Sequence, residues 1–283
     1  MVQEAIKKAD VLIEALPYIR KFQGNIFVIK YGGSILGEER VRKGVLEDIA
    51  FLRYAGIKPI IVHGGGPNIT ERLKEHKVAT KFVDGMRVTD EFTLKIVEEE
   101  LDKLNGMIVE EIGSHGVKAK GFLKRDGLLK AAKKKTKVDL GLVGEVIDYD
   151  RQRLEGSLRE HIPVICPMGV SSSGESYNIN ADEVAFFLAA KLQAEKLVLL
   201  TNVLGVMRDP RDPNSLIPTI TATGVEELIK NKTIDEGMVP KVRAAAQSIE
   251  SGVGKAHIVD CKIPHALLLE IFTDQGIGTE IIK

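Results

Sequence analysis

The sequence predicts an α/β fold with a mostly parallel sheet that is covered by helices on both faces. Apolar strand-like runs alternate with helix-like segments along the chain, which is the pattern of such sheets. Two of these runs, Ile26–Lys30 and Lys58–Val62, end in glycine-rich segments. Because ligands of parallel sheets bind beyond the carboxyl ends of the strands, we expect the functional site at these two segments.

The chain begins with a segment, residues 3–19, that is expected to form an amphipathic helix. Its apolar residues at helical spacing are Ile6, Ala9, Leu12, Ile13 and Leu16. Pro17 predicts that this helix kinks or ends nearby. Its apolar face must pack somewhere, either on its own subunit or on a neighbouring one.

Strands and helices then alternate up to the middle of the chain. Thr89 or Asp90 is expected to cap a helix that runs to Asn105. The other expected helices cover 40–54, 68–76, 107–115 and 151–160. The expected strands cover 26–30, 58–62, 117–122 and 162–166, with short β pieces separated by glycines at 141–148. A loop rich in serine and glycine, 169–176, predicts a boundary between two lobes.

The second half of the chain repeats this alternation. Asn180 can cap a helix over 181–192. The other expected helices cover 224–231, 239–251 and 265–273, and the expected strands cover 196–200, 256–260 and 278–282. Two Asp-Pro steps, at 209–210 and 212–213, mark a long loop between them.

The composition excludes several classes of protein. Lys plus Arg and Asp plus Glu both total 40, so a general basic surface for nucleic acid is not expected. No apolar stretch is long enough for a membrane helix, and the N-terminus is too charged for a signal peptide. The histidines show no metal-ligand spacing, and Cys166 and Cys261 are expected to be buried free thiols. We therefore expect a soluble cytoplasmic protein without a metal site.

The two glycine-rich segments predict a site for an anion such as a phosphate or a carboxylate. The second, His63-Gly64-Gly65-Gly66, leaves backbone N–H groups uncovered, and the helix that follows adds a partial positive charge. The first, Lys30-Tyr31-Gly32-Gly33-Ser34, adds a lysine. Neither G-x-x-x-x-G-K-[ST] nor G-x-G-x-x-G is present, so a bound nucleotide would need another scaffold.

Other polar residues have a functional and a structural interpretation. In Tyr177–Glu183, Asn178 and Asp182 could face a ligand, although a helix cap with acids that complement the dipole is the alternative. Lys241 begins a helix, where its charge opposes the dipole unless an anion offsets it; a solvated lysine is the alternative. Arg87, in a turn before a helix, suits bidentate carboxylate binding. The lysines at 133, 134, 135 and 137 are interpreted as a solvated loop.

Five motifs in this order resemble the N-acetylglutamate kinase family of the amino-acid kinase superfamily. They are Lys30-Tyr31-Gly32-Gly33-Ser34, Val62-His63-Gly64-Gly65-Gly66-Pro67, Gly85-Met86-Arg87-Val88-Thr89, Tyr177-Asn178-Ile179-Asn180-Ala181-Asp182 and Gly237-Met238-Val239-Pro240-Lys241. The resemblance implies a three-layer α/β/α sandwich around a mainly parallel sheet. It also implies ATP-dependent phosphorylation of the γ-carboxylate of N-acetyl-L-glutamate in arginine biosynthesis, with Mg²⁺ bound to the ATP phosphates.

The resemblance also assigns roles by position. Lys30 and Lys241 would contact the transferring phosphoryl group, and Asp182 would orient both lysines. The implied phosphate-binding residues are Gly32, Gly33, Gly64 and Gly65, and the implied substrate-binding residues are Gly65, Gly66, Arg87 and Asn178. Residues 1–24 would form a helix for oligomerisation, 25–173 a lobe that binds acetylglutamate, and 174–283 a lobe that binds ATP.

The N-terminal helix resembles an element that interlaces dimers into a ring in arginine-inhibited members. This implies a homohexamer, built as a trimer of dimers, with feedback inhibition by L-arginine. The implied arginine site consists of Tyr18, Lys196, His265, Glu270, Gly276 and Gly278. Glu270 would pair with the guanidinium, and the loop 276–278 would leave backbone carbonyls open to it.

One departure and three alternatives accompany this interpretation. Asn202 stands where many relatives carry Asp, which with the loop 207–217 leaves the nucleotide contacts less defined. A kinase of the same fold could act on another carboxylate, such as an aminoadipate derivative. A non-catalytic ligand sensor would not need Lys30, Asp182 and Lys241 together. A nicotinamide-dependent oxidoreductase is disfavoured by the missing G-x-G-x-x-G.

Overall fold

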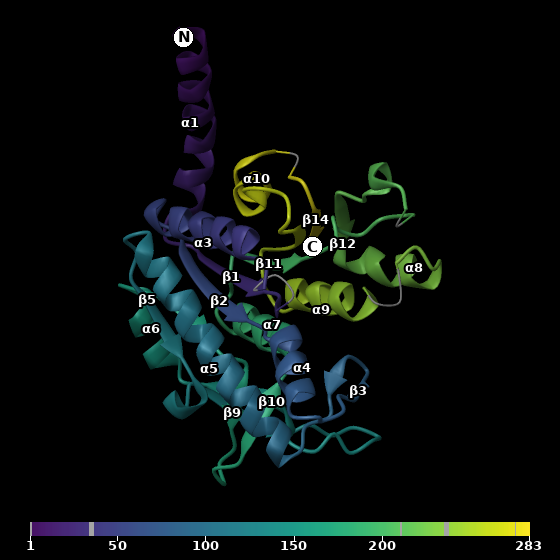
Figure 1. Cartoon of the computed structure of the whole chain (residues 1–283). Helices are drawn as coiled ribbons and strands as arrows, with labels where there is room; N and C mark the ends of the chain where they lie inside the picture. The colour runs from purple at the N-terminus through teal and green to yellow at the C-terminus, as the bar shows by residue number, and fades with distance from the viewer. Residues whose placement is uncertain (1, 34–36, 210, 235–237, 275) are drawn as a thin grey trace.

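The computed structural model describes residues 2–33, 37–209, 211–234, 238–274 and 276–283 (Figure 1). Three residues of the predicted motifs and loop, Ser34, Pro210 and Gly237, lie outside these ranges. Within the described residues, the main sheet has eight strands in the order β12-β14-β13-β11-β1-β2-β8-β5. Their bounds are β1 Ile26–Tyr31, β2 Lys58–His63, β5 Ala119–Phe122, β8 Ile162–Ile165, β11 Lys196–Thr201, β12 Thr219–Thr221, β13 Lys255–Asp260 and β14 Thr279–Ile282.

The main sheet is mostly parallel, as the alternation of elements predicts. All neighbours from β5 to β13 run parallel, whereas β14 is antiparallel to β13 and parallel to the edge strand β12. In the centre, Lys30 of β1 is in register with Val62 of β2 and Leu199 of β11. The glycine-rich segments that follow β1 and β2 therefore begin side by side at the carboxyl edge of the sheet.

Helices cover both faces of the sheet, which confirms the predicted three-layer sandwich (Figure 1). Phe27 and Ile29 of β1 pack in one core with α3, α5 and α10, whereas Val28 packs in the other with α6, α7, α8 and α9. The bounds are α3 Glu39–Tyr54, α5 Glu91–Ser114, α6 Arg151–Leu158, α7 Ala181–Lys191, α8 Val225–Lys230, α9 Val239–Glu250 and α10 Ala266–Phe272. The helix α4, Gly66–Glu75, starts directly after the glycines and packs on α5.

Four strands outside the main sheet form a small closed barrel, β10-β7-β6-β9. Their bounds are β6 Leu129–Lys133, β7 Val143–Tyr149, β9 Met168–Val170 and β10 Ser176–Ile179. The segment 169–176 is therefore not the plain loop that was predicted, because β9 and β10 pair antiparallel across a short turn. Buried Tyr177 and Ile179 anchor this hairpin, and the composition of its turn concealed the flanking strands. The short hairpin of β3, Phe82–Val83, and β4, Met86–Arg87, lies apart from both sheets.

Two predicted helix boundaries are wrong. The N-terminal helix α1, Val2–Phe22, continues through Pro17, which lies inside it. The proline leaves the Ile13 carbonyl without its N–H donor on an exposed stretch that water can reach, so the helix survives. The segments 91–105 and 107–115 form one helix, α5, because an isolated Gly106 lowers helix stability without ending the helix. The predicted cap of α5 is confirmed, since the side chain of Asp90 accepts a hydrogen bond from Thr93 N at 2.7 Å.

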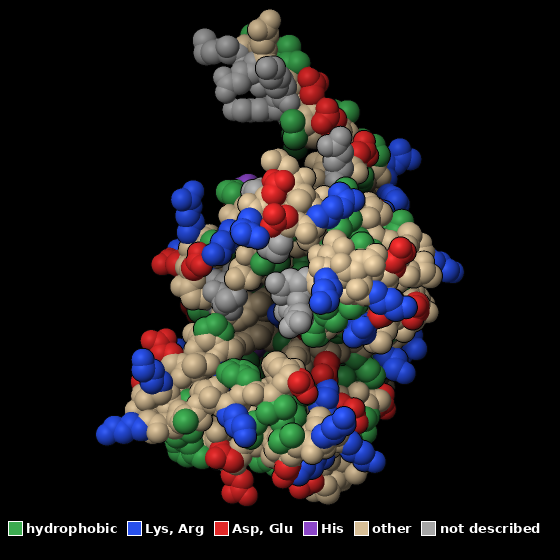
Figure 2. Space-filling model, turned by 90° about the vertical axis from the view of Figure 1, so that its right-hand side faces the viewer, with side chains coloured by type: hydrophobic (Ala, Val, Ile, Leu, Met, Phe, Trp, Pro, Cys, Tyr) green, Lys and Arg blue, Asp and Glu red, His purple; other side chains and the backbone are tan. Residues whose placement is uncertain are grey.

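The helix α1 projects from the body of the molecule (Figures 1 and 2). The predicted apolar residues are exposed, and Leu12 and Ile13 have 69% and 67% of their surface accessible. Only the end of the helix is anchored in the core, where the Phe22 ring packs edge-on against Phe27 with centroids 5.4 Å apart. Among the described residues no helix, α1 included, is long and apolar enough to cross a membrane. The apolar face of α1 therefore lacks a cover within the described part of this chain.

Candidate functional site

A cavity of about 360 Å³ lies where the ends of β1 and β2 meet β10 and the first turns of α4 and α7. Most of the residues predicted for substrate and phosphate line it: Lys30, Gly33, Gly64, Gly65, Gly66, Arg87, Asn178 and Asp182. Gly32 is buried and does not line the cavity, and Lys241 reaches it through Asp182. Parallel strand ends and helix N-termini thus converge at the edge of the sheet that the sequence predicted.

Asp182 binds two lysines that come from opposite directions. Its Oδ1 lies 2.9 Å from Nζ of Lys30 on β1, and its Oδ2 lies 2.5 Å from Nζ of Lys241 on α9. The position is fixed by Asn180, which caps α7 by accepting a hydrogen bond from Asp182 N at 2.8 Å. Burial alone would raise the pKa of Asp182, but the two ammonium groups outweigh burial and hold that pKa below its usual value. The carboxylate is therefore ionised and holds both cations beside the cavity.

The glycines are required by a close approach of two backbones. A Cβ atom on Gly33 would lie 2.8 Å from the backbone nitrogens of both Gly65 and Gly66. A Cβ atom on Gly65 would lie 2.8 Å from Cδ2 of Leu101. The contact with backbone atoms excludes a larger residue at Gly33, and both glycine segments line the cavity together with Lys30. The backbone N–H groups of these segments and the lysine suit an anion, which is the ligand that the glycines predicted.

Arg87 is a buried cation that lines the same cavity. Its guanidinium donates to Thr70 Oγ1 at 2.8 Å and to the Gly66 carbonyl at 3.0 Å, and it stacks on the Phe82 ring at 4.8 Å. Burial lowers the pKa of Arg87, and no carboxylate of the described residues pairs with it. An uncompensated buried guanidinium beside a cavity suits an anionic ligand, such as a carboxylate.

Asn178 faces the same cavity from β10. Its Nδ2 donates to Thr89 Oγ1 at 3.2 Å, and that hydroxyl donates to the Arg87 carbonyl at 2.8 Å. These bonds connect the barrel to the segment that carries Arg87. The side-chain oxygen of Asn178 remains available as an acceptor in the cavity.

A second cavity, of about 630 Å³, lies between the end of α1 and the C-terminal segment. Five of the residues predicted for arginine line it: Tyr18, Lys196, Glu270, Gly276 and Gly278. Nζ of Lys196 lies 2.8 Å from Nε2 of His257, and Nδ1 of His257 lies 2.6 Å from Oε1 of Glu270. His257 was not predicted, because its position on a buried strand gave no sign that it faces a cavity.

Two details of the predicted arginine site differ from expectation. His265 does not line this cavity; its Nδ1 lies 2.7 Å from Asp48 Oδ1 in a groove on the α3 side. It is the N-cap residue of α10 and has a left-handed backbone conformation. The loop 276–278 offers N–H groups as well, since the Gly278 N–H donates to Glu270 Oε2 at 2.9 Å. Glu270 is therefore already held by the backbone.

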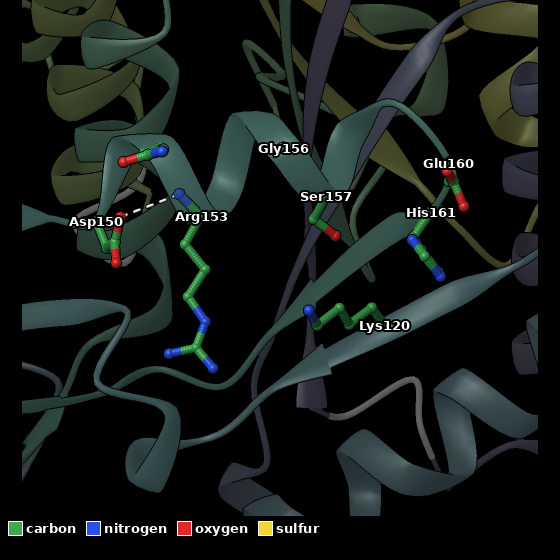
Figure 3. A pocket seen from close by; sticks show the side chains of 8 residues that line it. Lys120, Asp150, Arg153, Gly156, Ser157, Glu160 and His161 are labelled. Carbon is green, nitrogen blue, oxygen red and sulfur yellow. Dashed lines mark hydrogen bonds between the residues drawn. The ribbon is translucent and has the colours of Figure 1, made fainter.

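A third pocket, between β5 and α6, was not predicted. Figure 3 shows Lys120, Ser157 and His161 among the residues around this pocket. The charged groups there are engaged in structure, because Arg153 lies 3.1 Å from Asp126 and Asp150 caps α6. No signal in the sequence distinguishes these residues from an ordinary polar surface.

The remaining charge and cysteine predictions have mixed outcomes. The lysine-rich segment is not entirely a solvated loop, since Lys133 ends β6 and half-buried Lys134 pairs with Glu183 on α7. The face in Figure 2 shows positive and negative side chains interspersed. Cys166 and Cys261 are free and buried, as expected, and burial raises the pKa of the Cys261 thiol to about 12.

The comparisons with known proteins agree with this geometry. The model of the "Amino acid kinase family" matches residues 25–260. A protein of Methanocaldococcus jannaschii named acetylglutamate kinase is 45% identical, over 99% of this chain and 98% of its own length. The N-acetylglutamate synthase of Neisseria gonorrhoeae, solved with coenzyme A and N-acetyl-glutamate, is 26% identical with a TM-score of 0.87. A second structure of that synthase, with coenzyme A and L-arginine, is 25% identical with a TM-score of 0.84. The two comparisons cover 97% of this chain but only 63% and 65% of the synthase chains.

Proposed function

This chain belongs to the acetylglutamate kinase family within the amino acid kinase family, and we propose that it phosphorylates the γ-carboxylate of N-acetyl-L-glutamate with ATP. The product is N-acetylglutamyl 5-phosphate, an intermediate of arginine biosynthesis. Membership of the family confirms the resemblance predicted from the five motifs. The observation that carries the proposal is the pair of lysines on Asp182, beside a cavity that Lys30, Asp182 and the buried Arg87 line together.

This arrangement suits phosphoryl transfer to a carboxylate. A carboxylate oxygen attacks the γ-phosphorus, the bond to the β,γ-bridging oxygen breaks, and ADP leaves. The carboxylate is already ionised at neutral pH, so the reaction needs no general base. Negative charge spreads over the transferring group, and fixed cations and N–H donors stabilise it. Lys30, Lys241 and the N–H groups of Gly33 and Gly65 supply these charges and donors.

The substrate lies across the cavity in this proposal. Arg87 binds the α-carboxylate, Asn178 and the Gly66 region bind the N-acetyl end, and the γ-carboxylate points to Lys30. Asp182 orients the two lysines and does not itself react, because both of its oxygens are engaged. Residues 25–173 form the lobe for acetylglutamate and residues 174–283 the lobe for ATP, although one sheet continues through both.

The residues present fit a nucleotide that brings its own metal ion. Among the described residues no group of three or more His, Cys, Asp or Glu side chains could hold a metal. Mg²⁺ keeps several waters and binds mainly to phosphate oxygens at such sites, so a protein cage is not required. When bound, Mg²⁺ neutralises phosphate charge. Lys241 and Lys30 add charge from the protein, and Asn202, exposed after β11, is the altered position near the nucleotide. A cytoplasmic location is part of this proposal, because ATP and a biosynthetic intermediate are the substrates.

The proposal includes a ring-shaped homohexamer that L-arginine inhibits. The exposed apolar face of α1 fits a neighbouring subunit, because leaving Leu12 and Ile13 in water is unfavourable. The second cavity joins α1 to the C-terminal segment, so a ligand there can favour one arrangement of the ring over another. Glu270 is the acceptor for a guanidinium, and His257 takes the place that the resemblance implied for His265.

A substrate panel tests the function. The purified chain is assayed for ADP release with N-acetyl-L-glutamate, L-glutamate and N-acetyl-L-aminoadipate at equal concentration, with Asp182→Asn as the inactive control. The proposal expects the highest kcat/KM with N-acetyl-L-glutamate. Preference for the aminoadipate compound would favour a kinase of the same fold that acts on another carboxylate. Binding of N-acetyl-L-glutamate without ADP release would favour a non-catalytic sensor.

A further inference from the structure

His63 occupies a buried position directly before the glycines and has not been given a role above. Its side chain is fully buried at the end of β2. Nδ1 lies 3.1 Å from the carbonyl oxygen of Gly64, and Nε2 lies 3.1 Å from Nδ2 of Asn105 on α5. Asn105 Nδ2 also donates to the Val164 carbonyl at 2.9 Å. A polar chain thus runs from the centre of α5 to the phosphate-binding segment.

The hydrogen bonds fix the tautomer of His63. The Val164 carbonyl can only accept, so the NH₂ group of Asn105 is the group that faces both Val164 and His63. Because that NH₂ group donates, Nε2 of His63 accepts and the ring proton resides on Nδ1. Nδ1–H then donates to the Gly64 carbonyl. Burial lowers the pKa of His63 to about 4, so the ring stays neutral and this pattern persists at neutral pH.

Gly121 makes room for the side-chain amide of Asn105. A Cβ atom on Gly121 of β5 would lie 2.2 Å from Oδ1 of Asn105, which leaves space for no side chain there. The amide of Asn105 therefore fits only because a glycine occupies this position of β5. Such an arrangement holds the amide in one orientation.

The peptide between Gly64 and Gly65 connects the hydrogen bonds of His63 and Asn105 to the reaction site. In a trans peptide the carbonyl and the following N–H point in opposite directions, and the described residues contain no cis peptide. When His63 holds the Gly64 oxygen, the Gly65 N–H is therefore turned the other way. The Gly65 nitrogen borders the space beside Gly33, and its N–H donates to no carbonyl of the described residues.

Glycine needs such an anchor more than other residues. Without a Cβ atom, a Gly-Gly peptide rotates through conformations that are closed to other residues. A Cβ atom on Gly64 would lie 3.2 Å from the Gly33 nitrogen, and one on Gly65 would lie 2.8 Å from Cδ2 of Leu101, so a larger residue at either position requires its neighbours to move. An external hydrogen bond to the Gly64 carbonyl supplies the missing restraint.

We propose that His63 and Asn105 are positioning residues that hold the Gly64–Gly65 peptide with the Gly65 N–H turned toward the transferring phosphoryl group. This inference rests on the proposed function for its effect on rate. The orientation of the peptide itself does not depend on that function. His63 acts through Gly65 and does not touch the reacting atoms.

Two substitutions at one position separate the two hydrogen bonds. In His63→Asn the amide nitrogen can occupy the place of Nδ1 and donate to the Gly64 carbonyl. In His63→Gln the amide reaches the place of Nε2, keeps a partner for Asn105 and leaves the Gly64 carbonyl without a donor. We expect His63→Gln to lower kcat on the order of 10²-fold, as for loss of one oxyanion donor, and His63→Asn to retain kcat within about 10-fold. KM for N-acetyl-L-glutamate should change little in both.

A control distinguishes positioning from loss of stability. Ile108→Val removes one buried methylene from α5 and should lower Tm without lowering kcat. Equal kcat losses in His63→Gln and His63→Asn that follow their Tm losses would overturn the proposal. If both His63 variants fail to fold, Asn105→Ser, which frees Nε2, is expected to give an intermediate loss of kcat, and an unchanged kcat contradicts the inference.

A measurement without turnover keeps this inference separate from the proposed function. With ¹⁵N-glycine labelling, the Gly65 amide resonance should move in His63→Gln and remain near its parent position in His63→Asn. An unmoved resonance in His63→Gln refutes the positioning role even if the enzyme is active. A parent chain that is inactive on N-acetyl-L-glutamate, with the expected amide shifts, refutes only the proposed function.

Discussion

Nζ of Lys241 lies 2.5 Å from Oδ2 of Asp182, although the two residues are 59 positions apart in the chain. Their contact brings the start of α9 to the start of α7, where Asp182 also holds Lys30. It explains a lysine at a helix N-terminus, which is unfavourable by itself. The carboxylate compensates the positive charge until a phosphate is present. The geometry therefore favours the functional interpretation of Lys241 over a solvated lysine.

Replacing Lys241 by alanine should lower kcat more than it weakens substrate binding. Its charge is needed most when negative charge spreads over the transferring phosphoryl group, so a loss on the order of 10²-fold or more is expected. Lys30→Ala should behave similarly. Steady-state kinetics with both substrates varied measures the effect, and a kcat within a few-fold of the parent would remove Lys241 from the mechanism.

Arg87→Lys should mainly raise KM for N-acetyl-L-glutamate. A lysine keeps the charge but loses the paired N–H groups that grip a carboxylate, and it loses the stacking on Phe82. A rise of about 10-fold to 10²-fold corresponds to roughly 1–3 kcal/mol of binding. KM for ATP should be unchanged. Equal rises in both KM values would indicate that the cavity has collapsed.

Gly33→Ala should abolish most activity. Its Cβ atom would lie 2.8 Å from two backbone nitrogens, so the phosphate-binding segments must move apart. Gly44→Ala in α3 is the matched control, because nothing lies within 4 Å of its Cβ atom. The control should keep its activity and gain up to about 1 kcal/mol of stability from helix propensity. Kinetics and chemical unfolding of both variants check this, and an active Gly33→Ala would contradict the close approach.

The buried Lys196 should make stability depend on pH above neutrality. Burial lowers its pKa to about 8, from 10.5 in an unperturbed lysine. Between these values the unfolded chain binds more protons than the folded one, so the free energy of unfolding rises with pH. Lys196→Met removes this contribution, which is at most about 3 kcal/mol. Unfolding of both proteins at pH 7.5 and pH 10 measures the difference, and parallel pH profiles would show that Lys196 has an ordinary pKa.

The double variant Leu12→Ser, Ile13→Ser should dissociate the hexamer into active dimers that arginine does not inhibit. These side chains are mostly exposed within one chain, so the fold itself should lose little stability. Tyr18 and the arginine cavity remain in place, which separates loss of the ring from loss of the site. Deleting residues 1–20 should have the same effect on assembly. Glu14→Gln on the same helix is the control.

Size-exclusion chromatography with light scattering measures the oligomeric state, and arginine titrations measure the inhibition. A parent chain that runs as a dimer and ignores millimolar arginine would contradict the assembly and the regulation together. If arginine still inhibits the double variant when that variant is a dimer, the arginine site is supported, but inhibition does not act through the ring.

The sequence predicted the main sheet and most helices because their signals are local. Alternating apolar runs identify β1 and β2, and Asp90 and Asn180 mark helix starts through side-chain caps. It missed β6 and β12, which are short and depend on neighbouring strands rather than on their own pattern. Pro17 and Gly106 were given too much weight, because both lie inside helices; a glycine costs a helix only about 1 kcal/mol.

The candidate site was predictable in its residues and not in its connections. Glycines and lysines at strand ends indicate an anion site, whereas the contact of Asp182 with two lysines was expected only from the family resemblance. The reason for the glycines, two backbones in contact, also required the structure. His63 and His257 looked like ordinary residues of buried strands, whereas His265 was assigned to the arginine site by the family resemblance. Only the fold decides which histidine faces which cavity.

The central claim is transfer of a phosphoryl group to the side-chain carboxylate of N-acetyl-L-glutamate. The most direct test is incubation of the purified full chain with ATP, Mg²⁺, N-acetyl-L-glutamate and hydroxylamine, which converts an acyl phosphate into a hydroxamate. The account predicts hydroxamate in equal amount to ADP, none without ATP, and a rate reduced on the order of 10²-fold or more in Lys241→Ala. Absence of hydroxamate at saturating substrates would contradict it.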